Sequence, residues 1–455
     1  MQNTNLLNKY NIPGPRYTSY PTVPYWDEKG ISTNNWIQTI QQSFNESNSD
    51  KGISIYIHLP FCESLCTFCA CHKYITKRHE LEDPYIETVL KEWKLYLDLL
   101  PEKPVLRELH LGGGTPTFFE SDNLNHLIKS ILDSVVLHKD YEFSFEGHPN
   151  NTTKEHLQTL YNLGFTRVSF GVQDYGEKVQ KAINRIQSFE SVKNVTEWSR
   201  EIGYTSVSHD LIFGLPFQTV GNIIDTVKKT IELKPDRISF YSYAHVPWVK
   251  GIGQRGFDEG DIPKNDFKRK LYEMGKQMFS NFGYIETGMD HFSLPTDDLF
   301  KAFESANLHR NFMGYTTNNT LLMIGLGMSA ISDSWYSFAQ NEKSLKAYEE
   351  TIKKGVLPIV KGHLLTEEDL IIRRHILNIM CHFKTSWKDD KLKFKELPET
   401  LNRLKELEKD GLVLIKNNNL IVPKDARAFV RNICMAFDLR LVRNKPNTQL
   451  FSMTV

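Results

Sequence analysis

Four cysteines fall within ten residues of the chain, at Cys62, Cys66, Cys69 and Cys71. The first three have the spacing C-x3-C-x2-C and follow directly after the apolar run ISIYIHLP. Three thiolates on one short loop can hold three irons of a [4Fe–4S] cubane, because the loop brings their sulfurs to one side. Iron–sulfur clusters usually have four cysteine ligands, so the fourth iron would be open to another ligand. The spacing therefore predicts a cluster with one exchangeable iron.

A structural zinc site built from the same four cysteines is the alternative. Structural zinc normally joins two separated ligand pairs, whereas these four thiols would staple only their own loop. Cys71 is either a fourth cluster ligand or a bystander, and we expect a bystander. The remaining cysteines, Cys381 and Cys434, lie in apolar helical settings and are expected to be buried as small hydrophobic residues.

A regular strand–helix alternation begins after Gly52. In ISIYIHLP every second residue is apolar, so Ile53, Ile55, Ile57 and Leu59 share one face of a strand, and Tyr56 and His58 share the other. The pattern predicts six strands with helices between them. The strands are expected at 53–60, 106–111, 141–147, 167–173, 206–215 and 237–245, and the helices near 81–99, 121–137, 153–163, 188–202 and 219–233.

Polar and glycine residues gather at the carboxyl ends of these strands, for example in the segment 112–115 and at Glu146, Gln173 and Asp210. Doubly wound sheets and α/β barrels both place their active sites there. Six repeats fall short of the eight of a full barrel. We therefore predict an α/β fold with a partial (β/α)6 TIM-like barrel.

Changes in periodicity along the chain predict three regions. Residues 1–35 have no clear period and are expected to form an extended arm over the active site. Residues 36–340 would form the catalytic barrel. Residues 341–455 contain amphipathic helices and the hairpin pattern DGLVLIKNNNLIVP, so a mainly helical, winged-helix-like domain is expected there.

Composition excludes several classes of protein. The 455 residues contain 55 Lys plus Arg and 55 Asp plus Glu, so no global field attracts nucleic acid or an anionic membrane. We find neither an apolar run of membrane-spanning length nor the pattern of a signal peptide. We expect a cytoplasmic monomer that holds anionic ligands by local groups of basic residues.

Further motifs occur in order between residues 9 and 438: KYNIPGPRYTSYPT, YIHLPFC, LHLGGGTPT, GVQD, DLIFGLP, GMDHF and RNICMAFD. Together with the cysteine spacing they resemble the family of oxygen-independent coproporphyrinogen III oxidases, within the radical S-adenosylmethionine (SAM) superfamily. The resemblance implies a [4Fe–4S] cluster on Cys62, Cys66 and Cys69, with SAM on the open iron. A 5′-deoxyadenosyl radical would then start the oxidative decarboxylation of two propionates of coproporphyrinogen III to vinyl groups, giving protoporphyrinogen IX in heme biosynthesis.

The resemblance also implies a second SAM beside the first. Residues expected at the cluster-bound SAM are Tyr56, Gly113, Glu146 and Ile331. Residues expected at the second SAM are Phe68, Gly114, Thr115, Gln173, Arg185, Asp210 and Ala244. The residue types agree with this: glycines allow the backbone to approach a ligand closely, and carboxylates at strand ends can accept hydrogen bonds from it.

The porphyrinogen substrate carries four propionates, so its site needs cations, and Arg16 and Arg310 are the candidates. An electron donor such as flavodoxin or ferredoxin is also implied. The chain departs from the family pattern at two positions. His148 stands where relatives have aspartate, and Met313 stands where they have glutamine.

Three other functions remain open at this stage. A heme-binding chaperone resembles these enzymes but generally lacks the arm and the cysteine at position 71, both of which this chain has. A heme-modifying radical SAM relative would share the cluster and the barrel. A zinc-bound interaction protein would share only the cysteines.

Overall fold

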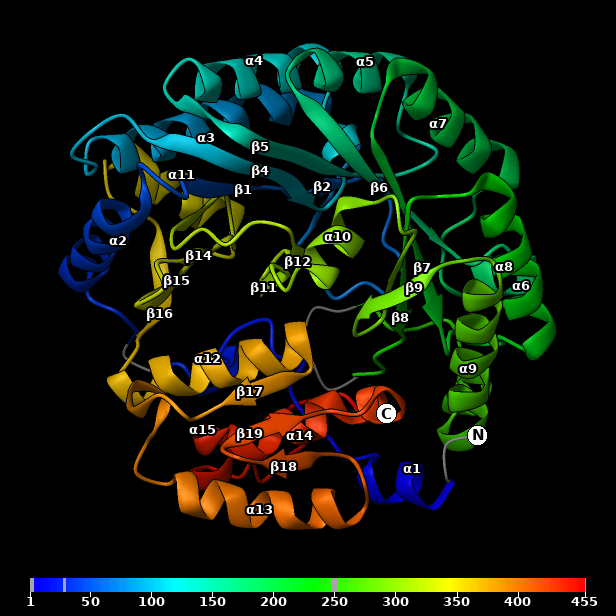
Figure 1. The fold of residues 1–455 in the computed structure, drawn as a ribbon. Coiled ribbons are helices and arrows are strands. Elements are labelled where there is room, and N and C mark those ends of the chain that lie inside the picture. The colour runs from blue at the N-terminus through cyan, green and yellow to red at the C-terminus, as the bar shows by residue number, and fades with distance from the viewer. Residues whose placement is uncertain (1–3, 28–29, 247–252, 455) are drawn as a thin grey trace.

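Six parallel strands form the centre of a twelve-stranded sheet (Figure 1). A computed structural model of the chain describes residues 4–27, 30–246 and 253–454. The sheet order is β16-β15-β14-β13-β1-β4-β5-β6-β7-β8-β10-β9. The six parallel strands thus lie side by side in chain order, as predicted. They are β1 (Ile53–Leu59), β4 (Val105–Gly113), β5 (Val136–Gly147), β6 (Phe165–Gln173), β7 (Ser206–Phe213) and β8 (Arg237–Ser242).

Helices between these strands cover the outer side of the curved sheet (Figure 1). The four apolar residues of β1 are fully buried in the core beneath them, which confirms the predicted face. Threonine side chains set two helix starts, because Thr153 and Thr219 each form a capping box. The helices are α3 (Glu82–Leu97), α4 (Ser121–Leu132), α5 (Lys154–Asn162), α6 (Glu177–Ala182), α7 (Phe189–Ile202) and α8 (Val220–Leu233).

Several details differ from the expectation. The helix predicted to reach residue 137 ends at Leu132, and β5 already begins at Val136. Short strands that the sequence pattern did not reveal extend the sheet at both edges. They are β9 (Ile285–Gly288), β10 (His291–Ser293), β13 (Met323–Leu326), β14 (Ile331–Asp333), β15 (Ser337–Asn341) and β16 (Ile359–Leu364). The expected domain boundary at 340/341 therefore lies inside β15, and the large sheet continues to Leu364.

The C-terminal region has a core of its own, built mainly by α12 (Glu367–His382), α13 (Leu397–Lys409) and α14 (Val430–Phe437). A small sheet of order β17-β19-β18 lies beside them. The predicted hairpin is present, and its turn residues Asn417 and Asn418 have φ of 51° and 59°. Both are left-handed, as a two-residue hairpin loop requires. The strands are β17 (Lys384–Ser386), β18 (Leu414–Lys416) and β19 (Asn419–Ile421).

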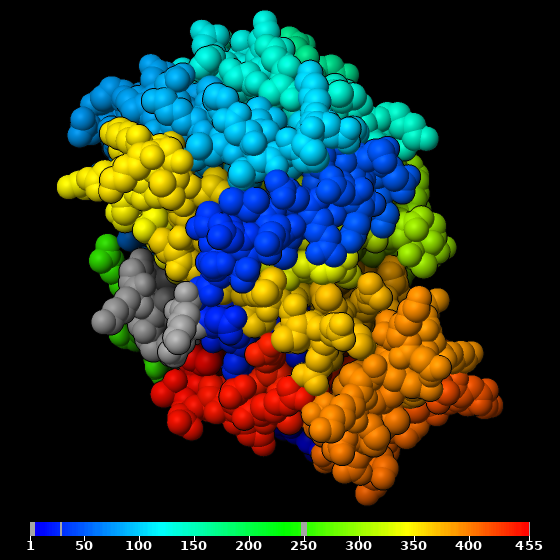
Figure 2. Space-filling model, turned by 90° about the vertical axis from the view of Figure 1, so that its left-hand side faces the viewer, coloured from blue at the N-terminus to red at the C-terminus, as the bar shows by residue number. Residues whose placement is uncertain are grey.

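The N-terminal segment packs against this C-terminal core rather than standing free (Figure 2). It is not wholly extended, because α1 (Thr4–Tyr10) is helical, and α2 (Thr33–Ser47) begins before the predicted end of the arm. Leu6 and Leu7 of the short helix α1 pack against the C-terminal core. No periodic pattern in the sequence predicts this tertiary contact. The Tyr17 hydroxyl donates to Asp438 at 3.0 Å.

The curved sheet and its helices form an arch, and the remaining elements lie around or inside it. The β11–β12 hairpin lies inside the curve, next to α12 (Figure 1). None of the described helices combines the length and apolarity that crossing a membrane requires. The elements are β2 (Phe61–Cys62), β3 (Tyr74–Ile75), α9 (Asn265–Asn281), α10 (Asp298–Glu304), β11 (His309–Asn311), β12 (Gly314–Thr316), α11 (Leu345–Lys353) and α15 (Leu439–Arg443).

A buried carboxyl group ties α3 to the loop between β13 and β14. Glu92 is fully buried and accepts hydrogen bonds from Gly327 N at 2.8 Å, Asn341 Nδ2 at 2.7 Å and Tyr348 Oη at 2.7 Å. Burial raises the pKa of Glu92 from 4.5 to about 7 despite these donors. The folded chain therefore holds the proton more tightly than the unfolded chain does.

Replacement of Glu92 by glutamine should change the pH dependence of stability. The stabilisation from the protonated carboxyl is complete below 4.5 and is lost as pH rises through about 7. The free energy of unfolding of the wild type should fall relative to Glu92→Gln by about 3 kcal/mol between about pH 4 and about pH 8. Urea unfolding at several pH values measures this. The exposed Glu155→Gln on α5 is the control, and a pH-independent difference for Glu92→Gln would contradict the prediction.

Candidate functional site

The cysteine loop is anchored at both sides by backbone hydrogen bonds. It leaves β1 at Leu59, and pairing of β2 with β3 closes its base through a bond from Thr76 N to Cys62 O at 2.9 Å. Its middle is attached to the end of α6, because Thr67 N donates to Ile183 O at 2.9 Å and Thr67 Oγ1 donates to Ala182 O at 2.9 Å. The loop is thus positioned at the carboxyl ends of the parallel strands.

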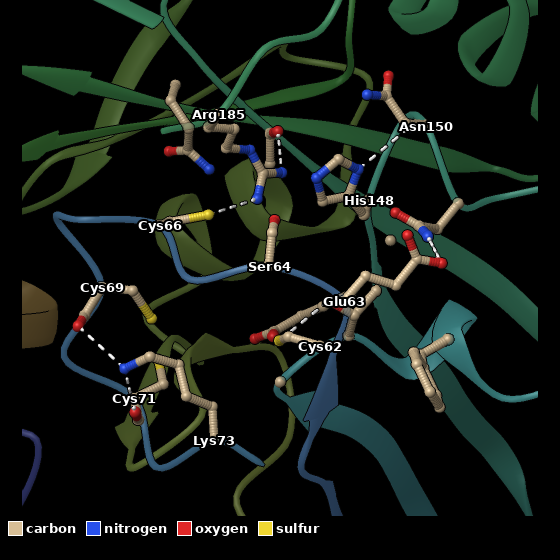
Figure 3. A pocket seen from close by; sticks show the side chains of 18 of the residues that line it. Cys62, Glu63, Ser64, Cys66, Cys69, Cys71, Lys73, His148, Asn150 and Arg185 are labelled. Carbon is tan, nitrogen blue, oxygen red and sulfur yellow. Dashed lines mark hydrogen bonds between the residues drawn. The ribbon is translucent and has the colours of Figure 1, made fainter. Parts of the chain in front are cut away.

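A cavity of about 440 Å³ opens beside this loop (Figure 3). Its walls come from the cysteine loop and from the ends of β4, β5, β6 and β7. Most of the predicted site residues meet there, although they are spread over some 150 positions of sequence. Those that line it are Cys62, Cys66, Phe68, Cys69, Gly113, Gly114, Thr115, Glu146, Gln173, Arg185 and Asp210.

Four cysteines, Cys71 among them, line this cavity with cations beside them. Arg185 Nη1 donates to Cys66 Sγ at 3.7 Å, and Cys62 Sγ lies 3.3 Å from Thr115 Oγ1. Lys73 Nζ donates to Cys69 O at 3.3 Å and to the exposed Cys71 at its carbonyl oxygen, 3.2 Å away (Figure 3). Soft thiolates from one loop, with positive charge to offset them, form a donor set that fits an iron–sulfur cluster.

The thiols do not converge on one point. Among the described residues, no three His, Cys, Asp or Glu side chains group closely enough to hold a single metal ion. A cubane with one open iron needs a different arrangement, since three of its irons each take a separate thiolate. The separated thiols around one cavity therefore suit a cluster better than a zinc ion.

Local electrostatics differ between the thiols. Burial raises the pKa of Cys62 to about 11. A hydrogen bond with the Cys71 thiol lowers the pKa of Cys69 to about 6, and the charges of Lys73 and Arg185 act in the same direction. A thiol must lose its proton to ligate iron, so these nearby cations favour the bound form.

The glycines at the end of β4 are required by close packing. Gly113 has φ of +119°, and a Cβ there would lie 2.8 Å from the His58 ring. A Cβ on Gly114 would lie 2.4 Å from Pro60 O. Gly114 N and Thr115 N donate to Leu59 O at 2.8 Å and Phe61 O at 2.9 Å, so this turn is held against the cysteine loop. The backbone can approach a ligand closely here.

Carboxylates and an amide line the opposite wall. The side chain of Glu146 is 49% exposed and points into the cavity, 3.7 Å from His110 Nε2. Burial raises the pKa of Asp210 to about 6, although Ser169 Oγ donates to it at 2.9 Å. Gln173 has φ of 67°, a left-handed conformation at the end of β6. These groups can accept hydrogen bonds from a polar ligand.

Three predicted residues do not line the cavity. Tyr56 lies just behind it, where its hydroxyl is 3.1 Å from His58 Nδ1. Ala244 follows β8, and its carbonyl oxygen accepts from Gln254 Nε2 at 2.7 Å. Ile331 packs with a separate apolar cluster around Trp26. Their roles in cofactor binding stay predictions.

Ser169 and Gly171 also line the cavity and were not predicted, whereas the imidazole of His148 was expected near the cofactor pocket. Ser169 and Gly171 alternate with Gln173 on β6, so the two-residue period could have found them. His148, one of the departures from the family pattern, also lines the cavity. Burial and the charge of Arg185 lower the pKa of His148 to about 3, so a neutral imidazole faces the site.

Comparisons with known proteins agree with this site. Residues 56–230 match the model of the radical SAM superfamily. The oxygen-independent coproporphyrinogen III oxidase of Synechocystis sp. is 36% identical, covering 99% of this chain and 97% of the relative. The enzyme of the same name from Escherichia coli strain K12 is 36% identical over 99% of this chain and 98% of its own length.

A solved structure extends the agreement to the fold. Coproporphyrinogen III oxidase from Escherichia coli, described as a radical SAM enzyme, superposes with a TM-score of 0.87 at 34% identity. The superposition covers 93% of this chain and 97% of that one. Sequence, fold and the cysteine-lined cavity together show that this chain belongs to the oxygen-independent coproporphyrinogen III oxidases of the radical SAM superfamily.

Proposed function

We propose that the chain converts two propionate side chains of coproporphyrinogen III to vinyl groups without oxygen, giving protoporphyrinogen IX. Each propionate would give one hydrogen atom to a 5′-deoxyadenosyl radical, forming 5′-deoxyadenosine, and would then release CO₂ and pass one electron to an external one-electron acceptor. The observation that carries the proposal is the cavity in which Cys62, Cys66 and Cys69 meet Gly114 and Asp210. Near full-length similarity to enzymes of that name supports the choice of substrate.

Cys62, Cys66 and Cys69 would hold the [4Fe–4S] cluster. When bound, the cluster and SAM supply a 5′-deoxyadenosyl radical, which can abstract a hydrogen atom from a propionate. Arg185 places its charge 3.7 Å from Cys66 Sγ and would offset the negative charge of the thiolates. The turn at Gly113 would let SAM approach the strand ends, where Glu146 can accept a hydrogen bond from it.

A second SAM would lie along the wall formed by β6 and β7. Gln173, Arg185 and Asp210 line that wall. Arg185 Nε is buried without a hydrogen-bond partner among the described residues, so this guanidinium has a donor to offer. Phe68, Gly114, Thr115 and Ala244 would complete the contacts. An electron donor such as flavodoxin or ferredoxin would reduce the cluster.

Loss of one cluster ligand should abolish both radical formation and product. Under anaerobic conditions with dithionite, SAM and coproporphyrinogen III, Cys66→Ala should form 5′-deoxyadenosine and vinyl porphyrin at least about a hundredfold more slowly, because a direct ligand matters at least as much as its supporting residues. Mass spectrometry measures both products. Cys434→Ala, in the buried C-terminal core, should keep both. Vinyl product from Cys66→Ala at the wild-type rate would refute the assignment.

Removal of the Asp210 charge should weaken the second SAM site alone. A charge-assisted hydrogen bond contributes about 1.5–3 kcal/mol, so Asp210→Asn should lower SAM affinity there about tenfold or more. Equilibrium dialysis on the reconstituted protein should then find one tightly bound SAM where the wild type binds two. The exposed Asp140→Asn serves as control. Unchanged stoichiometry in Asp210→Asn would count against a second SAM at this wall.

A further inference from the structure

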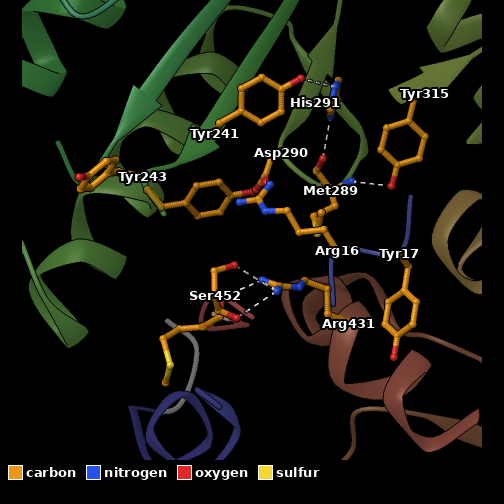
Figure 4. A network of polar contacts seen from close by, with 12 residues as sticks. Arg16, Tyr17, Tyr241, Tyr243, Met289, Asp290, His291, Tyr315, Arg431 and Ser452 are labelled. Atoms are coloured by element: carbon orange, nitrogen blue, oxygen red, sulfur yellow. Dashed lines mark hydrogen bonds and ion pairs between the residues drawn. The ribbon is translucent and has the colours of Figure 1, made fainter. Parts of the chain in front are cut away.

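Arg16 of the N-terminal segment forms an ion pair with Asp290, in the turn between β9 and β10 (Figure 4). Arg16 Nη1 lies 3.2 Å from Asp290 Oδ2, and their side chains are 30% and 13% exposed. The pair is thus partly open to solvent and is held by one contact. A single contact of this kind leaves the other guanidinium donors available to a second anion.

The surroundings of this pair are rich in positive charge. Lys268 and Arg431 lie close enough for their charges to act on each other and on Arg16. Of the two carboxylates that line the adjoining cavity, Glu286 already accepts from Tyr272 Oη at 2.8 Å and Lys276 Nζ at 2.6 Å. Asp290 alone therefore faces the cations, and the site has an excess of positive charge.

The other two arginines near Arg16 donate to backbone carbonyl oxygens of the arm. Arg431 donates to Pro15 O at 2.9 Å and to Met453 O at 2.7 Å, which fixes the arm against the C-terminal tail. Arg310 donates to Tyr17 O at 3.3 Å and to Arg16 O at 3.4 Å, and stacks on Tyr315. Arg310 thus holds the backbone of the arm, while its Nη1 is buried without a hydrogen-bond partner among the described residues, so its role as a propionate ligand stays a prediction. Arg16 is the cation whose partner can be exchanged.

The place of the pair suits a substrate that also reaches the cofactor cavity. The cavity beside Arg16 measures about 50 Å³, enough for one carboxylate but not for a tetrapyrrole ring. The charges of Asp210 and Asp290 both act on Tyr241 of β8, whose hydroxyl lies 3.2 Å from His291 Nε2, so the ion pair and the wall with Asp210 lie on the same side of the sheet. A tetrapyrrole carries its propionates around its rim. One propionate can therefore occupy this cavity while another lies at the cofactors.

We propose that Arg16 binds a propionate of the substrate that is not reacting, and that this carboxylate replaces Asp290 as its partner. The inference rests on the proposed function. Asp290 would hold Arg16 in place while the site is empty and would compete with the substrate carboxylate. Arg310 and Arg431 would keep the arm fixed while the partner changes.

The exchange predicts opposite effects for the two members of the pair. The probe is coproporphyrin III, the oxidised tetracarboxylate, titrated into the reconstituted full-length protein and followed by tryptophan fluorescence. Arg16→Gln should weaken binding about tenfold to a hundredfold, as loss of a charge-assisted hydrogen bond implies. Arg16→Lys should recover part of that loss. Asp290→Asn should bind the probe more tightly than the wild type, because the competing carboxylate is gone.

Lys9→Gln is the matched control, since Lys9 is another cation of the same arm that pairs with Asp410 on the surface. It should bind the probe as the wild type does. 5′-Deoxyadenosine formation without porphyrinogen, driven by dithionite, reports that the cofactor site of each variant is intact. If Arg16→Gln and Asp290→Asn weakened binding of the probe equally, the ion pair would have only a structural role and the inference would be overturned. Unchanged binding of the probe by Arg16→Gln would overturn it as well. A wild type that forms 5′-deoxyadenosine but neither binds the probe nor makes vinyl product would overturn the proposed function with it.

Discussion

The two-residue period of parallel strands decides where chemistry can occur in this protein. On β1 the alternating isoleucines are fully buried against the outer helices, so Tyr56 and His58 must face the inside of the arch. The same alternation applies on β6, where Ser169, Gly171 and Gln173 face the cavity together. Because all six strands run in one direction, their polar ends meet at one edge. The cysteine loop begins at that edge, so its thiols lie beside the polar strand ends.

The inner space of the arch is closed by segments from both ends of the chain. Tyr10, Tyr17 and Tyr20 of the N-terminal segment are buried in the same core as α12 and α14. The guanidinium of Arg431 holds the arm by its backbone carbonyl oxygens rather than by its side chains. Backbone contacts of this kind fix the path of the arm while leaving Arg16 free to act.

Sequence reasoning succeeded where a repeated pattern or a dense motif was present. Alternation over β1 and the strand–helix repeats predicted the central sheet, and the cysteine spacing led to the cavity that Figure 3 shows. The strands β13 to β16 were missed because three to six residues are too few to show a period. The position of Arg310 could not be foreseen either. Its burial depends on the arm, which is distant in sequence and meets Arg310 only in the folded chain, whereas Tyr315 is its cross-strand partner in the same hairpin.

Zero net charge conceals a strong separation of charge within the molecule. The chain has equal numbers of acidic and basic residues, yet the region around Arg16 is positive. The cofactor cavity is mixed in charge, because Arg185 and Lys73 share it with Glu63, Glu146 and Asp210. Around Arg16, in contrast, a single carboxylate faces several cations. Positive charge that the protein itself does not fully neutralise costs folding free energy unless an anion is bound. A substrate carboxylate would remove that cost, so the same charges that weaken the empty protein favour the loaded one.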